Sequence, residues 1–150
     1  MAASLRILVI DDEPALRLVV AAPLRRAGHA VELAGGGREA LARLAQGDIE
    51  LALCDISMPD VGGIEVLRQS RAAGYATSFV MMTAFGAVET AVEALQAGAS
   101  DYLVKPVRAV ELLHRLDRIA EVRALRSENE ALRQRLAAAG DPGLPPSTPQ

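Results

Sequence analysis

The sequence is poor in cysteine and in aromatic residues. Cys54 is the only cysteine, tryptophan is absent, and aromatic residues make up 3% of the 150 positions. A single cysteine excludes an internal disulfide framework and favours a reducing compartment, so we expect a cytoplasmic protein in which Cys54 is a small buried core residue. With so few aromatic side chains, the core should consist of Val, Leu, Ile and Ala, which favours helices packed on a buried sheet.

Three other features are missing, and each excludes a class of protein. No apolar run is long enough for a signal peptide or a membrane span, since the opening run Leu5–Ile10 contains Arg6 and is followed by acidic residues. No glycine-rich phosphate-binding loop follows that run, which counts against nucleotide binding. The net charge of -3 gives no general attraction to nucleic acid or to an anionic membrane. A role in transcription would therefore need a partner or a further domain.

What the sequence does contain is a regular alternation of short apolar runs and helical patterns. Several of the runs are continuously apolar, which is typical of strands covered on both faces. Five strand-then-helix units predict an α/β fold with a five-stranded parallel sheet and helices on both sides. The runs are Leu5–Ile10, His29–Ala34, Ile49–Cys54, Ser78–Met82 and Asp101–Val104.

Local patterns describe two of the helices in more detail. Pro23 falls inside the first expected helix and removes a hydrogen bond to the carbonyl of Val19, so we expect a kink or an early 3₁₀-like ending there. A later helix should end at Gly98. Its apolar residues recur at three- and four-residue spacings and share one face; they are Val88, Ala91, Val92 and Leu95.

The last helical pattern is unusually long and runs from about Val107 to Ala138. Its first turns carry Val110, Leu113 and Leu116, which are expected to cover one face of the sheet. The pattern then changes to alternating spacings of three and four residues, as in the a and d positions of a coiled coil. The residues of this seam are Val122, Leu125, Asn129, Leu132 and Leu136.

Charges beside the seam favour a parallel, in-register dimer. With Val122 at position a, Glu121 of one chain would face Arg126 of the other, and Glu128 would likewise face Arg133. Asn129 at an a position is a common device for specifying two strands. The alternative is a single amphipathic helix that folds back on its own domain. We therefore expect a globular domain over residues 4–120, a coiled-coil linker helix over 121–139 and a disordered Pro/Gly-rich tail over 140–150.

Acidic residues follow two of the expected strands. Asp11 and Asp12 come directly after the first run, and Asp55 comes directly after the third. Because parallel strands end at a common edge, these carboxylates should lie close together and repel one another unless a cation neutralises them. An oxygen-only cluster suits Mg²⁺, and a carboxylate beside that ion can attack a phosphoryl group.

Two further polar residues end the remaining strands. Thr83 follows the fourth run and Lys105 the fifth, and both could stabilise phosphoryl oxygens. Pro106 could hold a cis bond that turns Lys105 inward. Each residue alone is weak evidence, because an Asp after a strand is usually a helix cap and Lys-Pro is usually a solvated turn. Their joint placement at the ends of four strands is what points to a site.

This combination resembles the receiver domain of two-component response regulators, in the CheY-like superfamily. The resemblance covers roughly residues 4–120 and implies a flavodoxin-like sheet of order 2-1-3-4-5. The motifs that carry it are Asp11-Asp12, Asp55 in DISMP, Thr83-Ala84 in MTAFG and Lys105-Pro106 in DYLVKP.

The resemblance also implies roles for individual residues. The acidic pair would bind Mg²⁺ together with Asp55 and the main-chain carbonyl of Ser57, and Asp55 would take a phosphoryl group from a phosphohistidine of a partner sensor kinase. Thr83 and Lys105 would contact that group, and Tyr102 would change rotamer on activation. Such a domain is a switch that catalyses only its own phosphorylation and dephosphorylation, not an enzyme in the usual sense.

The stretch from Met82 to Val107 is similar to receivers of the NtrC-like class, which are joined through a helical linker to an AAA+ ATPase and a DNA-binding domain. The implied output is transcription by a sigma-54 activator, or action on a partner protein. The sequence fits either a piece of such a regulator or a stand-alone receiver with a dimerising tail. Two departures are a loop reading DVGGIE after Pro59, where Gly62 adds mobility, and a small Ala84 that leaves access for water.

Other functions fit these residues less well. A phosphatase on a similar sheet would turn over many phosphoesters, whereas a receiver forms one adduct per site. A basic-zipper DNA binder is disfavoured because the arginines of the last helix are interleaved with acidic residues, so we expect no direct nucleic-acid contact and no membrane contact. A receiver acting as a phosphorylation-independent dimerisation module remains the alternative. The dimer could also use the face formed by the fourth helix, last strand and last helix. His29 and His114 lack ligand-like spacing, so surface positions are expected.

Overall fold

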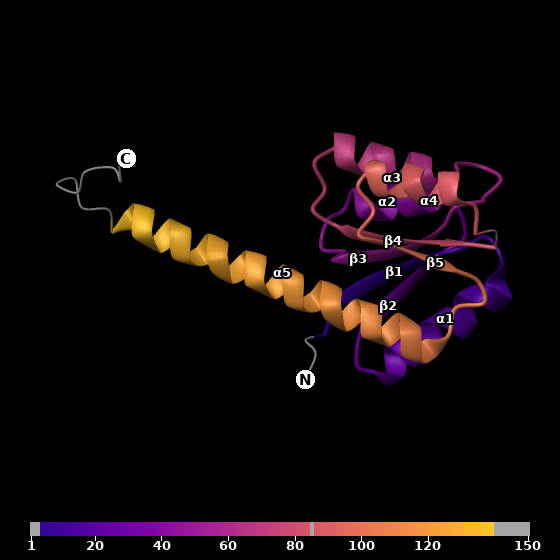
Figure 1. The fold of residues 1–150 in the computed structure, drawn as a ribbon, viewed down its shortest axis with the longest axis horizontal. Helices are drawn as coiled ribbons and strands as arrows, with labels where there is room; N and C mark the ends of the chain where they lie inside the picture. The colour runs from indigo at the N-terminus through magenta and orange to yellow at the C-terminus, as the bar shows by residue number, and fades with distance from the viewer. Residues whose placement is uncertain (1–3, 85, 140–150) are drawn as a thin grey trace.

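A computed structural model of the chain describes residues 4–84 and 86–139. Its centre is a parallel sheet with the strand order β2-β1-β3-β4-β5 (Figure 1). Both the α/β class and this order confirm the sequence-based prediction. The strands are β1 (Arg6–Ile10), β2 (Ala30–Ala34), β3 (Leu51–Asp55), β4 (Ser78–Thr83) and β5 (Asp101–Val104).

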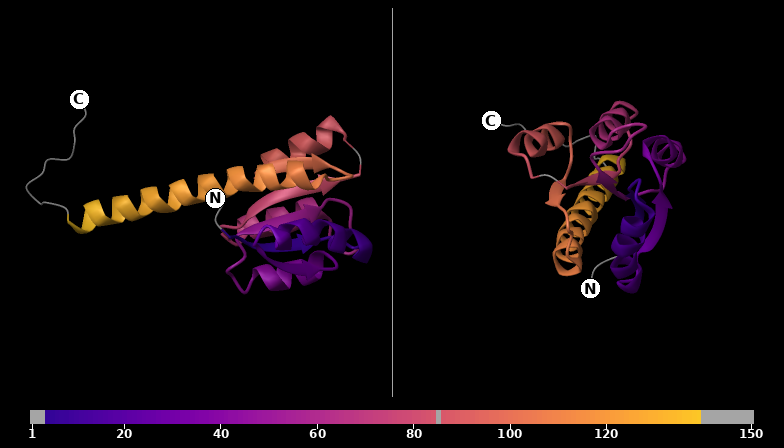
Figure 2. Two further views of the ribbon diagram at one scale, coloured as in Figure 1. Left: turned by 90° about the horizontal axis from the view of Figure 1, so that it is seen from below. Right: turned by 90° about the vertical axis from the view of Figure 1, so that its right-hand side faces the viewer.

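Helices cover both faces of the sheet, as the right-hand view of Figure 2 shows. One apolar cluster packs beneath α1 and α5, and a second packs beneath α2, α3 and α4. Residues of β1 alternate between them, with Val9 in the first and Ile10 in the second. The helices are α1 (Pro14–Arg26), α2 (Gly37–Leu44), α3 (Gly63–Ala72), α4 (Val88–Gln96) and α5 (Ala109–Ala138).

The central strands account for the continuously apolar runs. Every residue of β3 and β4 is buried, because both strands have neighbours on each side and helices on each face. The edge strand β2 alternates between more and less exposed positions instead. In the register of the sheet, Ile10 pairs with Cys54 and Asp55 with Met82, which aligns the carboxyl ends of β1, β3 and β4. Cys54 is fully buried, as predicted.

The first half of α5 packs on the sheet through a different stripe from the one predicted. Leu112, Leu116 and Ala120 are buried at i, i+4 and i+8, whereas Val110 is 83% exposed. The prediction that Leu116 covers the sheet is therefore confirmed, and the same prediction for Val110 is wrong. The orientation of α5 on the sheet turns Leu112 inward in place of Val110. Leu113 is partly buried at the margin of this cluster.

Beyond Ala120, α5 continues as one helix that extends past the edge of the sheet (Figures 1 and 2). We call residues 121–139 the stem. The tail over 140–150, for which a disordered linker was predicted, lies outside the described residues. Among the residues that the structure describes, no helix has both the length and the apolar character needed to cross a bilayer.

Two local expectations are corrected by the structure. The helix α1 continues past Pro23 to Arg26, so the early ending is wrong. Val19, whose carbonyl would accept the missing hydrogen bond, is 64% exposed, so water can replace the lost donor. His29 is buried and not at the surface, because its Nδ1 accepts a hydrogen bond from the backbone N–H of Leu5 at 3.0 Å. His114 is exposed, as predicted.

The helix α4 ends at Gln96 and Gly98 adopts a positive φ of 109°, as the sequence predicted. Its apolar stripe is not a core face, however. Val88, Val92 and Leu95 are 73%, 45% and 50% exposed, and only Ala94 of this helix is buried. The stripe therefore forms an apolar surface on the outside of the domain.

Candidate functional site

The carboxyl ends of the strands bring the predicted acidic residues into one cluster. Asp11 follows the last residue of β1, and Asp55 is the last residue of β3. Carboxylate oxygens of Asp11, Asp12 and Asp55 all lie within 4.8 Å of one another. Asp11 and Asp55 are buried, and Asp12 is the more open of the three. The sequence-based expectation that these three residues meet is fulfilled by the geometry.

Lys105 reaches into the same cluster from the end of β5. Its Nζ donates a hydrogen bond to Asp11 Oδ2 at 2.8 Å and lies 3.3 Å from Asp55 Oδ2. The backbone N–H of Lys105 donates to the carbonyl of Thr83 at 2.7 Å, which ties the end of β5 to β4. The Lys105–Pro106 peptide bond is cis, as predicted.

Burial and neighbouring charges shift the pKa values of Asp55 and Lys105. Burial raises the pKa of Asp55 and the negative charge of Asp11 adds to this, while Lys105 opposes both. Burial alone would lower the pKa of Lys105, but the hydrogen bond to Asp11 and the charge of Asp55 outweigh it, so that pKa is raised. An ionised Asp55 beside a second carboxylate is thus costly, and a bound cation would relieve that cost.

Backbone contacts orient the two buried carboxylates. Asp11 Oδ1 accepts a hydrogen bond from the N–H of Glu13 at 3.0 Å, and Asp55 Oδ1 accepts one from the N–H of Ser57 at 3.3 Å. Arg17 donates from Nη1 to the carbonyl oxygen of Asp11 at 2.7 Å, a contact that sequence reasoning missed. Each carboxylate keeps its Oδ2 toward Lys105.

The two predicted switch residues lie on the strands beside Asp55. Thr83 is the last residue of β4 and is 4% exposed. Since Asp55 pairs with Met82, Thr83 lies one residue further along the neighbouring strand, at the same edge as the carboxylates. Tyr102 in β5 is partly buried and packs against the apolar cluster beneath α2, α3 and α4. Thr83 therefore lies at the edge of the sheet that carries the acidic cluster, and Tyr102 lies on the neighbouring strand.

Two residues that sequence reasoning missed follow β3, Asp60 in the loop and Gly63 at the start of α3. Asp60 accepts hydrogen bonds from the N–H groups of Gly37 and Arg38, both at 3.0 Å, and so caps α2 from a distant loop. Backbone N–H groups, that of Arg38 first, lower the pKa of Asp60 to about 2. Gly63 lies against the carbonyl of Asp55, so a Cβ there would collide with it. In the sequence, the pair Gly62-Gly63 could have indicated the close approach to Asp55. The absence of a capping side chain at Gly36, before α2, could have indicated a cap from elsewhere in the chain.

The donor set suits a hard divalent cation. All three acidic side chains offer oxygen, no sulfur or imidazole ligand lies among the candidate donors, and the more open Asp12 leaves room for water ligands. A parallel doubly wound sheet with this cluster at the carboxyl ends of its strands defines a CheY-like receiver fold.

Comparison with known families agrees with the fold and the site. Residues 7–117 match the family model described as the response regulator receiver domain. The match covers well over half of the chain, and the chain belongs to this family. The sequence-based resemblance is confirmed at this level: the chain is a signalling module of the two-component type and not a conventional enzyme.

Individual relatives extend the comparison. The transcriptional regulatory protein ZraR of Salmonella typhimurium is 46% identical over 101 residues, which are 67% of this chain and 23% of the relative. The transcriptional regulatory protein TcrA of Mycobacterium tuberculosis is 37% identical over 142 residues, which are 95% of this chain and 54% of that protein. This chain thus spans about a quarter to about half the length of these relatives.

Solved structures show the same fold. A CheY-like receiver domain protein from Methanospirillum hungatei superposes with a TM-score of 0.78 at 31% identity, covering 83% of this chain and 99% of its own. The receiver domain of a putative LuxO repressor protein from Vibrio parahaemolyticus gives a TM-score of 0.81 at 26% identity, with coverage of 85% and 98%.

Proposed function

We propose that Asp55 accepts a phosphoryl group from a sensor histidine kinase in a Mg²⁺-dependent reaction. The observation that carries the proposal is the position of the Asp55 carboxylate, within 4.8 Å of the Asp11 and Asp12 oxygens and 3.3 Å from Lys105 Nζ. A buried carboxylate held beside two others and a lysine has the partners that phosphoryl transfer needs. We place this reaction in the cytoplasm, as the single buried Cys54 favours.

The proposed transfer uses the residues as follows. An Oδ atom of Asp55 attacks the phosphorus, the N–P bond of the phosphohistidine breaks, and the kinase imidazole leaves as an acyl phosphate forms. Lys105 then exchanges its carboxylate partner for a phosphoryl oxygen, and the Thr83 hydroxyl donates to another. Asp11, Asp12, Asp55 and the Ser57 carbonyl would hold Mg²⁺, which neutralises the charge that develops on the phosphoryl oxygens.

We further propose that phosphorylation changes the surface formed by α4, β5 and α5. Tyr102 connects β5 to the interior, and apolar side chains lie exposed on all three elements. A phosphoryl group adds about -1.5 to -2 charges at neutral pH, which is enough to bias a two-state element. The exposed residues of this surface are Val88, Val92, Leu95, Val104 and Val110.

Metal removal tests the phosphorylation proposal. With acetyl phosphate as donor, intact-mass spectrometry should show one phosphoryl adduct per chain in Mg²⁺, and excess EDTA should slow its formation at least about 100-fold, because Lewis-acid stabilisation contributes several kcal/mol. Restoring Mg²⁺ to the same sample should restore labelling. Equal labelling rates with and without EDTA would remove the metal from the proposed mechanism.

We also propose that the stem forms a parallel two-stranded coiled coil with a second copy of the chain. The support is the direction of the seam. The domain-facing stripe of α5 runs through Leu116, Ala120 and Arg123, and Leu125 lies about 140° around the helix axis from Ala120. Leu125, Leu132 and Leu136 therefore point away from the domain-facing stripe, whereas Val122 and Asn129 line hollows between α5 and the domain. Val122, Leu125, Leu132 and Leu136 are 45%, 64%, 47% and 71% exposed.

A charge in the seam should abolish this dimer. Leu132→Glu places two carboxylates in the apolar interface, and we expect the dimer dissociation constant to rise at least about 100-fold, or roughly 3 kcal/mol. Sedimentation equilibrium measures it. Ala131→Glu is the matched control, since it adds the same charge beside position 132 at an exposed site outside the seam and should leave the dimer unchanged. If both variants dimerise equally, the seam is not the interface.

The output that we propose is control of transcription, through a sigma-54 activator or a partner protein. Its support is the similarity to proteins named as transcriptional regulators, of which this chain spans only a part. The exposed seam favours one second candidate, a receiver that serves as a dimerisation module whether or not it is phosphorylated. Sedimentation with and without beryllofluoride and Mg²⁺ separates the two, since only a switch changes mass or shape.

A further inference from the structure

A groove lies where the stem leaves the domain, at the opposite end of the sheet from Asp55. Ser78 and Asp101, the first residues of β4 and β5, line it, whereas Asp55 ends β3. The groove has a volume of about 470 Å³. Facing these strand ends are four arginines of α5, namely Arg115, Arg118, Arg123 and Arg126. We call this feature the basic groove.

The basic groove carries an excess of positive charge in a chain whose net charge is -3. Against its four guanidinium groups stands one carboxylate, Asp101. Arg115 is neutralised locally, because it pairs with Asp101 and with Glu111. Arg118 and Arg126 are exposed and make no ion pair with any residue that the structure describes. Like charges at such helical spacings repel one another, so the groove favours an anion.

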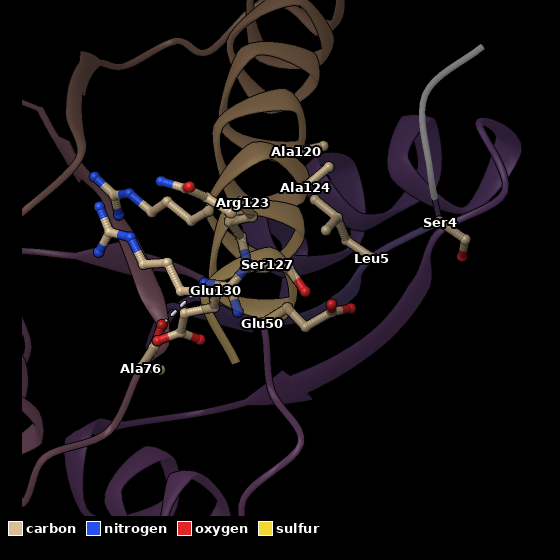
Figure 3. Close-up of a pocket in the computed structure, with 12 residues that line it drawn as sticks. Ser4, Leu5, Glu50, Ala76, Ala120, Arg123, Ala124, Ser127 and Glu130 are labelled. Carbon is tan, nitrogen blue, oxygen red and sulfur yellow. Dashed lines mark hydrogen bonds between the residues drawn. The ribbon is translucent and has the colours of Figure 1, made fainter. Parts of the chain in front are cut away.

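The walls of the basic groove are held in place by hydrogen bonds. Arg123 donates from Nη1 to the carbonyl of Ala76 and to Ser78 Oγ, both at 2.9 Å. Figure 3 shows Arg123 reaching from α5 toward Ala76. Arg115 is fixed in turn by Asp101. Two arginines are thus preorganised, and the two unpaired ones are available to close over a ligand.

The groove also adjoins the seam. Arg118 precedes Val122 by four residues, which continues the seam spacing backward, and Val122 itself lines the groove. An arginine at this position is unfavourable against a second Arg118 in a parallel dimer. This arrangement explains why the apolar seam begins only at Val122.

A second cavity on the other side of Arg123, of about 650 Å³, is less suited to anions. It is the cavity drawn in Figure 3, where Glu50 and Glu130 line it together with Arg123. Including Arg126 and Arg133, it has three guanidinium groups and two carboxylates. The charge balance therefore singles out the basic groove.

We propose that the basic groove binds a diphosphate, either inorganic or as part of a nucleotide. Guanidinium groups bind phosphate oxygens in a bidentate manner, and a diphosphate offers one phosphate to each of Arg118 and Arg126, which line the same groove. The hydroxyl of Ser100 adds a donor at the rim. This site does not include Asp55, so its test is separate from that of the proposed phosphorylation. In the proposed parallel dimer, Glu121 of the second copy would compete with the ligand for Arg126.

The test is a titration of the whole chain with pyrophosphate in EDTA, at constant ionic strength, followed by calorimetry and by the amide NMR signals of Ser78 and Ser100. We expect saturation at one diphosphate per chain. The double variant Arg118→Gln/Arg126→Gln should bind at least about tenfold more weakly, because each lost bidentate contact removes a charge-assisted pair of hydrogen bonds. A parallel titration with a nucleoside diphosphate tells whether the base adds affinity, and saturation by either ligand supports the site.

The matched control is Arg26→Gln/Arg135→Gln, which removes the same charge at two exposed positions away from the groove. It should bind pyrophosphate as the unmodified chain does. Chemical shifts that grow linearly without saturating, or equal affinity in both double variants, would overturn the proposal. The amide spectra report at the same time whether each variant is folded.

Discussion

An Asp55→Asn protein is expected to form no phosphoryl adduct with acetyl phosphate and to remain folded. The asparagine side chain has nearly the same shape but lacks the nucleophilic carboxylate, so the acyl phosphate cannot form. Intact-mass spectrometry under conditions that label the unmodified chain measures the loss, which should be complete. Labelling of the Asp55→Asn protein at the original rate would show that another residue is the acceptor.

The Asp55→Asn protein is also expected to be at least as stable toward urea as the unmodified chain. The pKa of Asp55 is raised in the folded chain, chiefly by burial, so its ionised form costs stability at pH values above the unfolded pKa. Asparagine removes this cost and the repulsion by Asp11, while Lys105 keeps its 2.8 Å bond to Asp11. In EDTA at neutral pH, the urea midpoint of the Asp55→Asn protein should equal or exceed that of the unmodified chain.

Asp60→Asn is the matched control, because it also replaces a carboxylate by an amide, in the loop that follows Asp55. It should lower stability and leave labelling intact, which is the opposite of the result expected for Asp55→Asn. The pKa of Asp60 is lowered to about 2, so its charge stabilises the fold above the unfolded pKa, and this contribution is lost as pH falls toward 2. The Asp60→Asn protein should therefore be less stable at neutral pH yet still accept phosphate. A pair of variants that both lose labelling would indicate damage to the fold and not loss of the acceptor.

Gly63→Ala is expected to destabilise the chain by about 3 kcal/mol, at the upper end for overpacking. An alanine Cβ at this position would collide with the carbonyl of Asp55 and lie 2.9 Å from Ile56 Cα. Both neighbours are backbone atoms, so no flexible side chain can give way. The N–H of Gly63 also donates to the Ile56 carbonyl at 2.9 Å, which holds the loop tight. Urea unfolding measures the change.

The adjacent Gly62→Ala variant serves as its control. A Cβ there meets the Ile56 carbonyl oxygen at 3.5 Å, an ordinary contact, and the backbone φ of -65° is open to alanine. The reduced freedom of the unfolded chain favours alanine, while the helix N-cap position favours glycine, so the change should stay within about 0.5 kcal/mol. If Gly63→Ala were equally mild, the loop would be able to move away from Asp55.

Much of the site could be predicted because parallel strands convert sequence position into spatial position. Asp11, Asp55 and Lys105 are far apart in the chain, yet each comes at the end of a strand, and the sheet order brings the ends together. Periodicity likewise located all five strands and the length of α5. It could not assign the buried stripe of α5, since Val110 and Leu112 differ only in which way the helix is turned on the sheet.

Contacts between distant loops were beyond prediction for a related reason. The hydrogen bonds of His29 with Leu5 and of Asp60 with Gly37 join segments with no periodic relation, so neither residue type nor spacing indicates them. Arg17 is similar, because its bond to the Asp11 carbonyl depends on how α1 is placed after the strand. Of these contacts only that of Arg17 involves a residue of the acidic cluster, and none supplies its chemistry.

The sequence by itself determined the succession of strands and helices along the chain, the acidic and basic residues at the strand ends, and the seam of the stem. It did so because hydrophobic periodicity and strand boundaries are local properties. Only the tertiary structure decided that Lys105 pairs with Asp11 and Asp55, and that four arginines of α5 meet the starts of β4 and β5. Those outcomes depend on packing angles between elements, which no local pattern specifies.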